Sequence, residues 1–185
     1  SDLKVLKKEN NSSSRSQLLN CLQSNLKLAK AELRQSFYND NDGAIYVGMH
    51  AWVIDVLLQL LYSETHKYCH GGSDLAVIAV GGYGRGEMAP YSDVDLLFLF
   101  PYRQTPWGEQ VVEYLLYMMW DLGLKVGNAT RSVEECIRLA QTDITIRTSL
   151  LEARYLCGDP SLYRELRRCF RREIVAQTGP DYVEA

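Results

Sequence analysis

Two short apolar runs stand at the centre of the chain, separated by a polar, glycine-rich stretch. Leu75–Val80 reads LAVIAV and Val94–Phe100 reads VDLLFLF. Each run is rich in β-branched and large apolar side chains and is bounded by glycine, proline or a Ser-Asp pair, which is typical of a buried strand. The pattern therefore predicts two core strands joined by the polar stretch.

Apolar residues recur at three- and four-residue steps on both sides of this centre, which predicts helices packed on the strands. The expected helices are Gln17–Phe37, Ile45–His66, Gly108–Leu122, Val133–Ala140, Asp143–Leu156 and Ser161–Ile174. A strand at Leu124–Thr130 would complete a strand–helix–strand unit. Ser132 and Glu135 have the spacing of a capping box. The polar segment Ser1–Ser16 is expected to be a loose arm.

These elements predict one mixed α/β domain with a small sheet inside a jacket of helices. We expect residues 1–72 to supply an N-terminal arm and helices that pack on the core, 73–131 to form the core, and 132–185 to be a helical part of the same domain. In the second predicted helix, the buried stripe is expected to contain Trp52, Val53, Val56, Leu57, Leu60 and Leu61. A chain of 185 residues is long enough to bury a substantial core.

The composition narrows the class of protein without identifying it. With 46% hydrophobic and 23% charged residues, the chain resembles ordinary globular domains. Its net charge of −3 argues against broad affinity for nucleic acid, since such proteins normally carry a basic excess. No apolar run is expected to reach the roughly 20 residues of a membrane span. The five cysteines lack paired spacing, which favours reduced thiols in a cytoplasm.

The stretch between the two strands carries the most distinctive polar pattern. It begins with GGYGRGE at 81–87, whose glycines let the backbone turn sharply and bring N–H groups up to an anion. Asp93 and Asp95 then open the second strand, and because strand side chains alternate, both carboxylates point to the same face. A bound divalent cation relieves the repulsion of two such charges, and oxygen ligands suit Mg²⁺.

A Gly-Gly turn after a strand, followed by Asp-x-Asp at the start of the next, resembles the signature of the polymerase-β-type nucleotidyltransferase superfamily. The strings VGGYGRGEMAPYSDVDLL, WDLGLKVGNATRSVEECIRLA and DITIRTSLLEARYLCGD are similar to the N-terminal domain of the GlnD family of bacterial uridylyltransferase/uridylyl-removing enzymes. The resemblance implies an α+β fold with a polymerase-β-like nucleotidyltransferase core. The HD and ACT domains of that family are absent from these residues, so the chain is expected to be part of a longer protein.

The resemblance also implies an activity. It implies transfer of UMP from UTP to a tyrosine of the signalling protein PII, with release of pyrophosphate and with Mg²⁺ or Mn²⁺ as cofactor. Such a reaction needs negative charge neutralised at the attacking and leaving oxygens, which two metals can do. We therefore expect Asp93 and Asp95 to be catalytic metal ligands, and Gly81 and Gly82 to offer backbone N–H groups to the β- and γ-phosphates.

Other polar residues are candidates for the same site. Arg85 is the best nearby cation for phosphate, because its planar guanidinium binds phosphate oxygens in pairs. Ser92 is expected to donate to a phosphate or to cap the turn, and Glu87 to orient Arg85. Superfamily members usually carry a third carboxylate on the following strand, but Leu124–Thr130 contains no acid. The candidates to supply a catalytic base or an extra ligand are Asp121, Asp143 and Glu152, of which we favour Asp143. Lys125 and Arg131 could meet the triphosphate or a partner protein.

Several alternatives remain open at this stage. His66, Cys69 and His70 have spacing that could hold zinc, although the glycines that follow favour a helix end. The arginines between Arg164 and Arg172 indicate a solvated helix face, or else a docking surface for an acidic partner. The domain could modify a different acceptor, or it could be a non-catalytic module that binds nucleotide or a partner protein.

Overall fold

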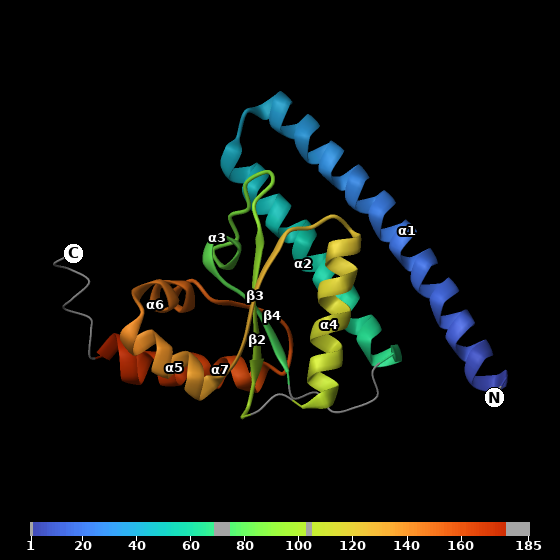
Figure 1. Ribbon diagram of the computed structural model, residues 1–185. Helices are drawn as coiled ribbons and strands as arrows, with labels where there is room; N and C mark the ends of the chain where they lie inside the picture. Colours follow the sequence, from blue (N-terminus) through green and yellow to red (C-terminus); the bar gives the residue numbers. More distant parts are fainter. Residues whose placement is uncertain (1, 69–74, 103–104, 177–185) are drawn as a thin grey trace.

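The two predicted central strands lie in the middle of a mixed sheet (Figure 1). The computed structural model describes residues 2–68, 75–102 and 105–176, with the backbone alone described at 2–14 and 66–68. Within these residues the sheet has the order β3-β2-β1-β4. Its strands are β1 (Ala76–Ala79), β2 (Val94–Phe100), β3 (Val126–Ser132) and β4 (Arg154–Gly158). β2 runs parallel to β3, whereas β1 is antiparallel to both β2 and β4, so the expected mixed α/β fold is confirmed.

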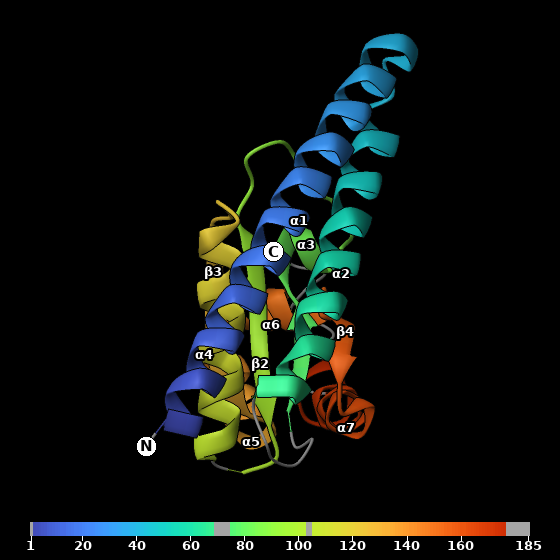
Figure 2. The same ribbon diagram turned by 90° about the vertical axis from the view of Figure 1, so that its right-hand side faces the viewer.

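Helices cover both faces of this sheet (Figures 1 and 2). The elements are α1 (Asp2–Asp40), α2 (Gly43–Tyr68), the short α3 (Gly81–Gly84), α4 (Pro106–Asp121), α5 (Val133–Thr142), α6 (Ile144–Leu151), α7 (Pro160–Phe170) and a π-helical turn, η1 (Arg171–Val175). α2 and α4 pack on one face of the sheet, and α1 lies along the outside of α2. α5 and α7 pack on the other face, with Leu150 of α6 in the same core.

The alternation of side chains in β2 explains this layering. Leu96 and Phe98 belong to the core under α2 and α4, whereas Leu97 and Leu99 belong to the core under α5 and α7. Asp95 has the same parity as Leu97, so its carboxylate stands on the α5–α7 face. Because the strand is otherwise apolar on both faces, Asp95 is an isolated polar position in the centre of the fold.

The N-terminal segment differs from the prediction. α1 is continuous from Asp2 to Asp40, so the loose arm expected at Ser1–Ser16 is wrong for the described residues 2–16. This stretch is polar, but it contains neither glycine nor proline, and nothing in it breaks a helix. Arg15 ties this part of the helix to the body of the protein, because its Nη2 lies 2.8 Å from Asp121 Oδ2 at the end of α4.

The buried stripe of α2 is also displaced from the one expected. Leu57 and Leu61 are buried, as predicted, but Trp52, Val56 and Leu60 are exposed. The observed stripe contains Ala51, Ile54, Leu57, Leu58 and Leu61. Since apolar residues surround much of this helix, periodicity alone could not select the face that meets the sheet.

The segment that follows α6 contains a strand that the sequence analysis missed. A single helix was expected over Asp143–Leu156, but α6 ends at Leu151 and β4 begins at Arg154. Tyr155 and Cys157 of β4 pair with β1, so β4 is the edge strand on this side of the sheet. Gly158 then adopts φ +94°, with its Cα close to the Leu75 carbonyl, where a side chain would collide with the backbone.

One helix meets the length and composition requirements of a membrane span, contrary to expectation. Residues 43–65 of α2 form 23 residues of mean hydropathy 1.6. The same helix packs against α1, α4 and β4. Core helices of soluble proteins have similar length and hydropathy, so these two properties are weak evidence for a membrane span.

The described cysteines, Cys21, Cys136, Cys157 and Cys169, are all free thiols.

Candidate functional site

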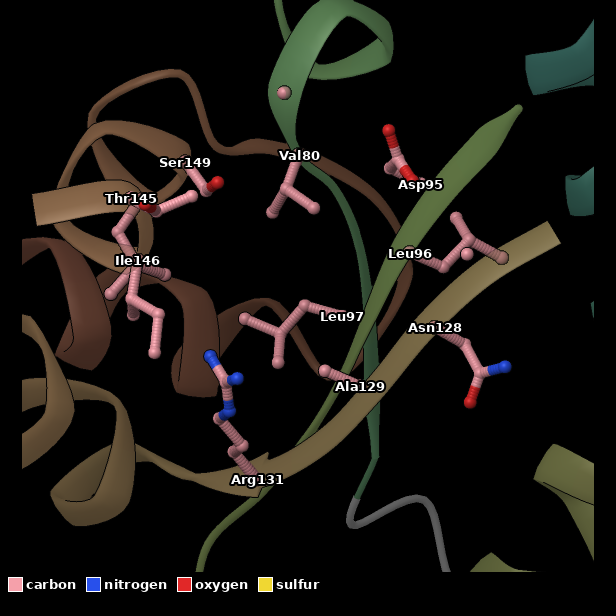
Figure 3. A pocket seen from close by; sticks show the side chains of 13 residues that line it. Val80, Asp95, Leu96, Leu97, Asn128, Ala129, Arg131, Thr145, Ile146 and Ser149 are labelled. Atoms are coloured by element: carbon pink, nitrogen blue, oxygen red, sulfur yellow. The ribbon is translucent and has the colours of Figure 1, made fainter. Parts of the chain in front are cut away.

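A cleft of about 300 Å³ lies between the sheet and α6, at the end of the sheet where β2 begins (Figure 3). The sheet supplies one wall, α6 the opposite wall, and the junction of β1 with α3 the edge between them. The residues that line it are Val80, Gly81, Asp95, Leu96, Leu97, Gly127, Asn128, Ala129, Arg131, Thr145, Ile146, Ser149 and Leu150. Apolar and polar groups therefore meet in one concave surface, as is usual for small-molecule sites.

Asp95 stands at one end of the cleft, where Gly127 leaves room for its carboxylate and Gly81 lies in contact distance on the other side. The β2–β3 register places Gly127 directly beside Asp95. A Cβ on Gly127 would lie 2.3 Å from Asp95 Oδ1, and a Cβ on Gly81 would lie 3.5 Å from Asp95 Oδ2. Gly81 also has φ +60°, a conformation that favours glycine. The local backbone thus forms a cradle around this one carboxylate.

The electrostatics of this end of the cleft favour a bound cation. Burial raises the pKa of Asp95, and the charge of Asp93 raises it further. Asp93 is exposed where the chain enters β2. Oxygen ligands of this kind suit Mg²⁺ or Mn²⁺, so Asp93 and Asp95 stay the candidates to hold such a cation. In the described parts of the chain, no His, Cys, Asp and Glu side chains form a cluster of three or more.

The other end of the cleft is cationic. Arg131 extends from β3 toward α6, at the opposite end from Asp95 (Figure 3). No carboxylate forms an ion pair with Arg131 within the described part of the chain. Thr145 and Ser149 bring hydroxyl groups from α6 to the same cleft. The cleft therefore offers an anionic end for a cation, a cationic end for an anion, and apolar walls between them.

The glycine turn at the edge of the cleft forms one turn of helix, α3, rather than an open loop. Its first intrahelical bonds run from Gly84 N to Val80 O (3.0 Å) and from Arg85 N to Gly81 O (3.1 Å). The N–H groups of Gly81 and Gly82 lie at the start of this turn, before the first residue whose N–H donates within the helix.

A polar network fixes the position of α3. Arg154 of β4 binds Asp55 of α2 through Nη1 and Nη2, at 2.6 and 3.1 Å. The same guanidinium donates to the carbonyl oxygens of Tyr83 and Gly84, at 3.1 and 3.2 Å. Tyr83 Oη donates to Asp55 Oδ1 at 2.7 Å. Burial and the nearby Asp55 raise the pKa of Tyr83, so its hydroxyl stays a donor. Three elements therefore meet in one network that holds the glycine turn.

Arg85 lies outside the cleft lining, next to α3. Its Nε donates to Glu87 Oε2 at 2.9 Å, and its Nη1 donates to Glu152 Oε1 at 2.6 Å. These hydrogen bonds raise the pKa of Arg85. The expected contact between Glu87 and Arg85 is therefore present, and Glu152 adds a second carboxylate that the sequence analysis did not connect with Arg85.

The other candidates are more scattered. Asp143 is the N-cap of α6, and its Oδ1 accepts from the N–H groups of Thr145 and Ile146, at 2.8 and 3.3 Å. It does not line the cleft. Asp121 binds Arg15 at the far end of α4. Ser92 lines a different pocket, on the α1–α2 side of the sheet. Among the candidate acids, the structure brings only Asp95 into the cleft lining, with Asp93 coupled to it.

Some functional candidates carried no signal of their own in the sequence. Gly127, Thr145 and Ser149 became candidates only through the strand register and the position of α6. The zinc alternative lies outside the described residues, since Cys69, His70 and the side chain of His66 are not among them.

Comparisons with known proteins show what the chain is similar to. Residues 67–150 match the nucleotidyltransferase domain family. The chain is 51% identical over 178 residues to the bifunctional uridylyltransferase/uridylyl-removing enzyme of Rhodospirillum rubrum. The matched residues make up 92% of this chain and 19% of that protein. It is 49% identical over 162 residues to the enzyme of the same name from Azospirillum brasilense. Here the matched residues make up 84% of this chain and 17% of that protein. The chain thus spans about a fifth of the length of these relatives.

Proposed function

Because this chain belongs to the nucleotidyltransferase family, as a domain of the bifunctional uridylyltransferase/uridylyl-removing type, we propose that it transfers UMP from UTP to a tyrosine of the protein PII in the cytoplasm. The tyrosine hydroxyl gives its proton to a base or to water, its oxygen forms a bond to the α-phosphorus, and the bond from that phosphorus to the bridging oxygen of pyrophosphate breaks. The choice of UTP follows the relatives' name, and the choice of PII follows the resemblance to the GlnD family, since no described residue reads a base or an acceptor.

The observation that carries the proposal is the cradle around Asp95. Gly127 leaves the space of a side chain beside the Asp95 carboxylate, which is partly buried and whose pKa is raised by burial and by the charge of Asp93. Asp93 and Asp95 would hold Mg²⁺ or Mn²⁺ there. The metal would supply positive charge to the phosphate oxygens at which negative charge develops.

Other residues of the cleft would bind and orient the nucleotide. The N–H groups at the start of α3, on Gly81 and Gly82, would donate to the terminal phosphates. Arg131 would neutralise a phosphate, and Thr145 and Ser149 would donate hydroxyl hydrogen bonds.

Three further roles remain proposals. Arg85 would contact a phosphate only with a guanidinium group that also binds Glu87 and Glu152. Asp143 would act as a base only by leaving its cap. Ser92 would contact phosphate only at the edge of the site, because it faces another pocket.

Transfer of labelled nucleotide to purified PII tests this proposal. UTP, ATP, CTP and GTP are compared with Mg²⁺, in the wild type and in Arg131→Met. We expect selective labelling from UTP and a KM for UTP at least about tenfold higher in Arg131→Met, from the loss of a charge-assisted contact. Arg138→Met, which removes an exposed arginine of α5, is the matched control and should leave KM unchanged.

Three results would contradict the proposal. Equal labelling from all four nucleotides would exclude selectivity for UTP. Labelling of another acceptor but not of PII would exclude the acceptor. Absence of labelling despite metal-dependent UTP binding would favour a binding module.

A further inference from the structure

A second polar pocket lies on the side of the sheet that faces α1 and α2. It has a volume of about 120 Å³, and the loop between α3 and β2 forms one wall. That loop is fixed against α2, because Met88 N donates to Val47 O at 3.2 Å. In Figure 1 the loop stands at the same end of the molecule as the α1–α2 turn. The residues that line the pocket are Lys30, Arg34, Tyr46, His50, Ile54, Met88, Pro90, Tyr91, Ser92, Val94, Gly123, Leu124 and Lys125.

The charges in this pocket are all of one sign. Lys30 and Arg34 come from α1, and Lys125 comes from the segment before β3. His50 of α2 adds a titratable group that is only 6% exposed. The lining contains no Asp or Glu, and neither Lys30 nor Lys125 forms an ion pair within the parts of the chain that the structure describes.

This arrangement is unfavourable for the protein alone. Burial lowers the pKa of Lys30, and the charge of Arg34 lowers it further. Burial also lowers the pKa of His50, and Lys30 adds to that effect against the opposing hydrogen bond to Met88. Lys30 and Arg34 are four residues apart on one helix, a spacing at which like charges destabilise the helix. An anion in the pocket would offset each of these effects.

The loop that closes the pocket is held in a strained conformation. Tyr91 has φ +67°, which is uncommon for a residue other than glycine. Arg34 Nη2 donates to Tyr91 Oη at 3.0 Å, so one of the cations holds the strained residue in place. Strain of this kind concentrates at ligand-binding segments. Ser92 follows directly and brings a hydroxyl group to the same pocket.

We propose that Lys30, Arg34, His50 and Lys125 form a binding site for a phosphate-type oxyanion, separate from the Asp95 cleft. The pocket volume of about 120 Å³ gives room for a phosphoryl group beside these cations. The anion would be free phosphate or pyrophosphate, or a phosphate carried on a nucleoside.

NMR of the His50 ring tests the site directly. The protein is titrated with inorganic phosphate, pyrophosphate or UMP in separate arms, each at ionic strength held constant with chloride. We expect a saturable shift of the His50 resonance, with the resonances of His66 and His70 as internal references. Lys30→Met should raise the half-saturating concentration at least about tenfold. Lys27→Met removes the same charge from an exposed position on α1 and should change it less than about twofold.

The outcomes separate this site from the catalytic cleft. A response of His50 that persists in Asp95→Asn supports an independent site, whatever the transfer assay shows. A response that disappears in Asp95→Asn would assign the anion to the cleft and overturn the proposal. So would a response that chloride alone reproduces, equal effects of Lys30→Met and Lys27→Met, or no saturable shift with any of the three anions. Should Lys30→Met fail to fold, Lys125→Met provides the same comparison.

Discussion

Asp95 depends on a neighbour that has no side chain. The motif Asp-x-Asp identified Asp93 and Asp95 from the sequence, because two carboxylates at a strand start carry a chemical signature. Gly127 carries no such signature, and its role follows only from the register that sets it beside Asp95. A residue that acts by leaving space can be recognised only after the strands are paired.

Gly127→Ala tests this dependence. The new Cβ would lie 2.3 Å from Asp95 Oδ1, so the carboxylate must turn away, which displaces it by about 1 Å or more. We expect the rate of nucleotide transfer to fall at least about tenfold, while the free energy of unfolding changes by less than about 1 kcal/mol, because a flexible carboxylate can move. Gly48→Ala is the control, since its Cβ meets nothing within 4 Å. Full activity in Gly127→Ala would contradict the cradle.

His50 predicts a pH dependence of stability. Its pKa is below the ordinary value of about 6.5 in the folded protein, so the unfolded chain binds the proton more readily. This contribution to stability is complete above about pH 6.5 and is lost as the pH falls toward the folded pKa. We expect urea denaturation to show a decline in stability between about pH 7.5 and about pH 5.5 that is smaller in His50→Gln. An identical decline in both proteins would contradict the assignment.

At the scale of elements, three segments distant in sequence converge on α3. α2 contributes Asp55, β4 contributes Arg154, and α3 itself contributes Tyr83 and two carbonyl groups. The packing is also close, since a Cβ on Gly84 would lie 2.3 Å from the carbonyl oxygen of Glu152. The glycine turn is therefore rigid because of its surroundings and not because of its own sequence.

Asp55→Asn tests this network. The change keeps the shape of the side chain and leaves Arg154, 34% exposed, without its counter-charge. We expect a loss of about 1 to 2 kcal/mol in urea denaturation, less than for a fully buried pair. Hydrogen exchange at the amide of Gly84 should also become faster. Glu165→Gln weakens an exposed pair with a 3.9 Å separation and should cost less than about 0.5 kcal/mol. Equal losses in the two variants would contradict a special role for Asp55.

Comparison of the predicted with the observed elements shows which of them local sequence patterns are sufficient to predict. β2 matches its prediction at both ends, because an apolar run between turn residues has few alternatives. The capping box at Ser132 and Glu135 is confirmed, since its bonds are local. β4 was missed because its identity depends on pairing with β1, a contact that local periodicity does not contain. The exposed face of α2 was also misassigned, because contacts with the sheet, which local periodicity does not contain, decide which side of this apolar helix is buried.

At the scale of the whole molecule, the sheet separates two environments. One face is sealed by α2 and α4, with the cationic pocket at its edge. The other is covered by α5 and α7, while α6 stands off from it and leaves the Asp95 cleft open. The net charge of −3 does not show this difference, since Lys30, Arg34 and Lys125 line one pocket without an acid, whereas the other cleft contains Asp95 and Arg131.

The role of Asp95 as a metal ligand is tested by the initial rate of UMP transfer from UTP to PII, compared between the wild type and Asp95→Asn at equal concentrations of folded protein. We expect a fall of about a hundredfold or more, with melting temperature retained, because Asn keeps the shape but removes the charge that would hold the metal. Asp143→Asn, measured beside it, tests the third-acid assignment separately. An Asp95→Asn variant that retained most of the wild-type rate would contradict the metal-binding cleft.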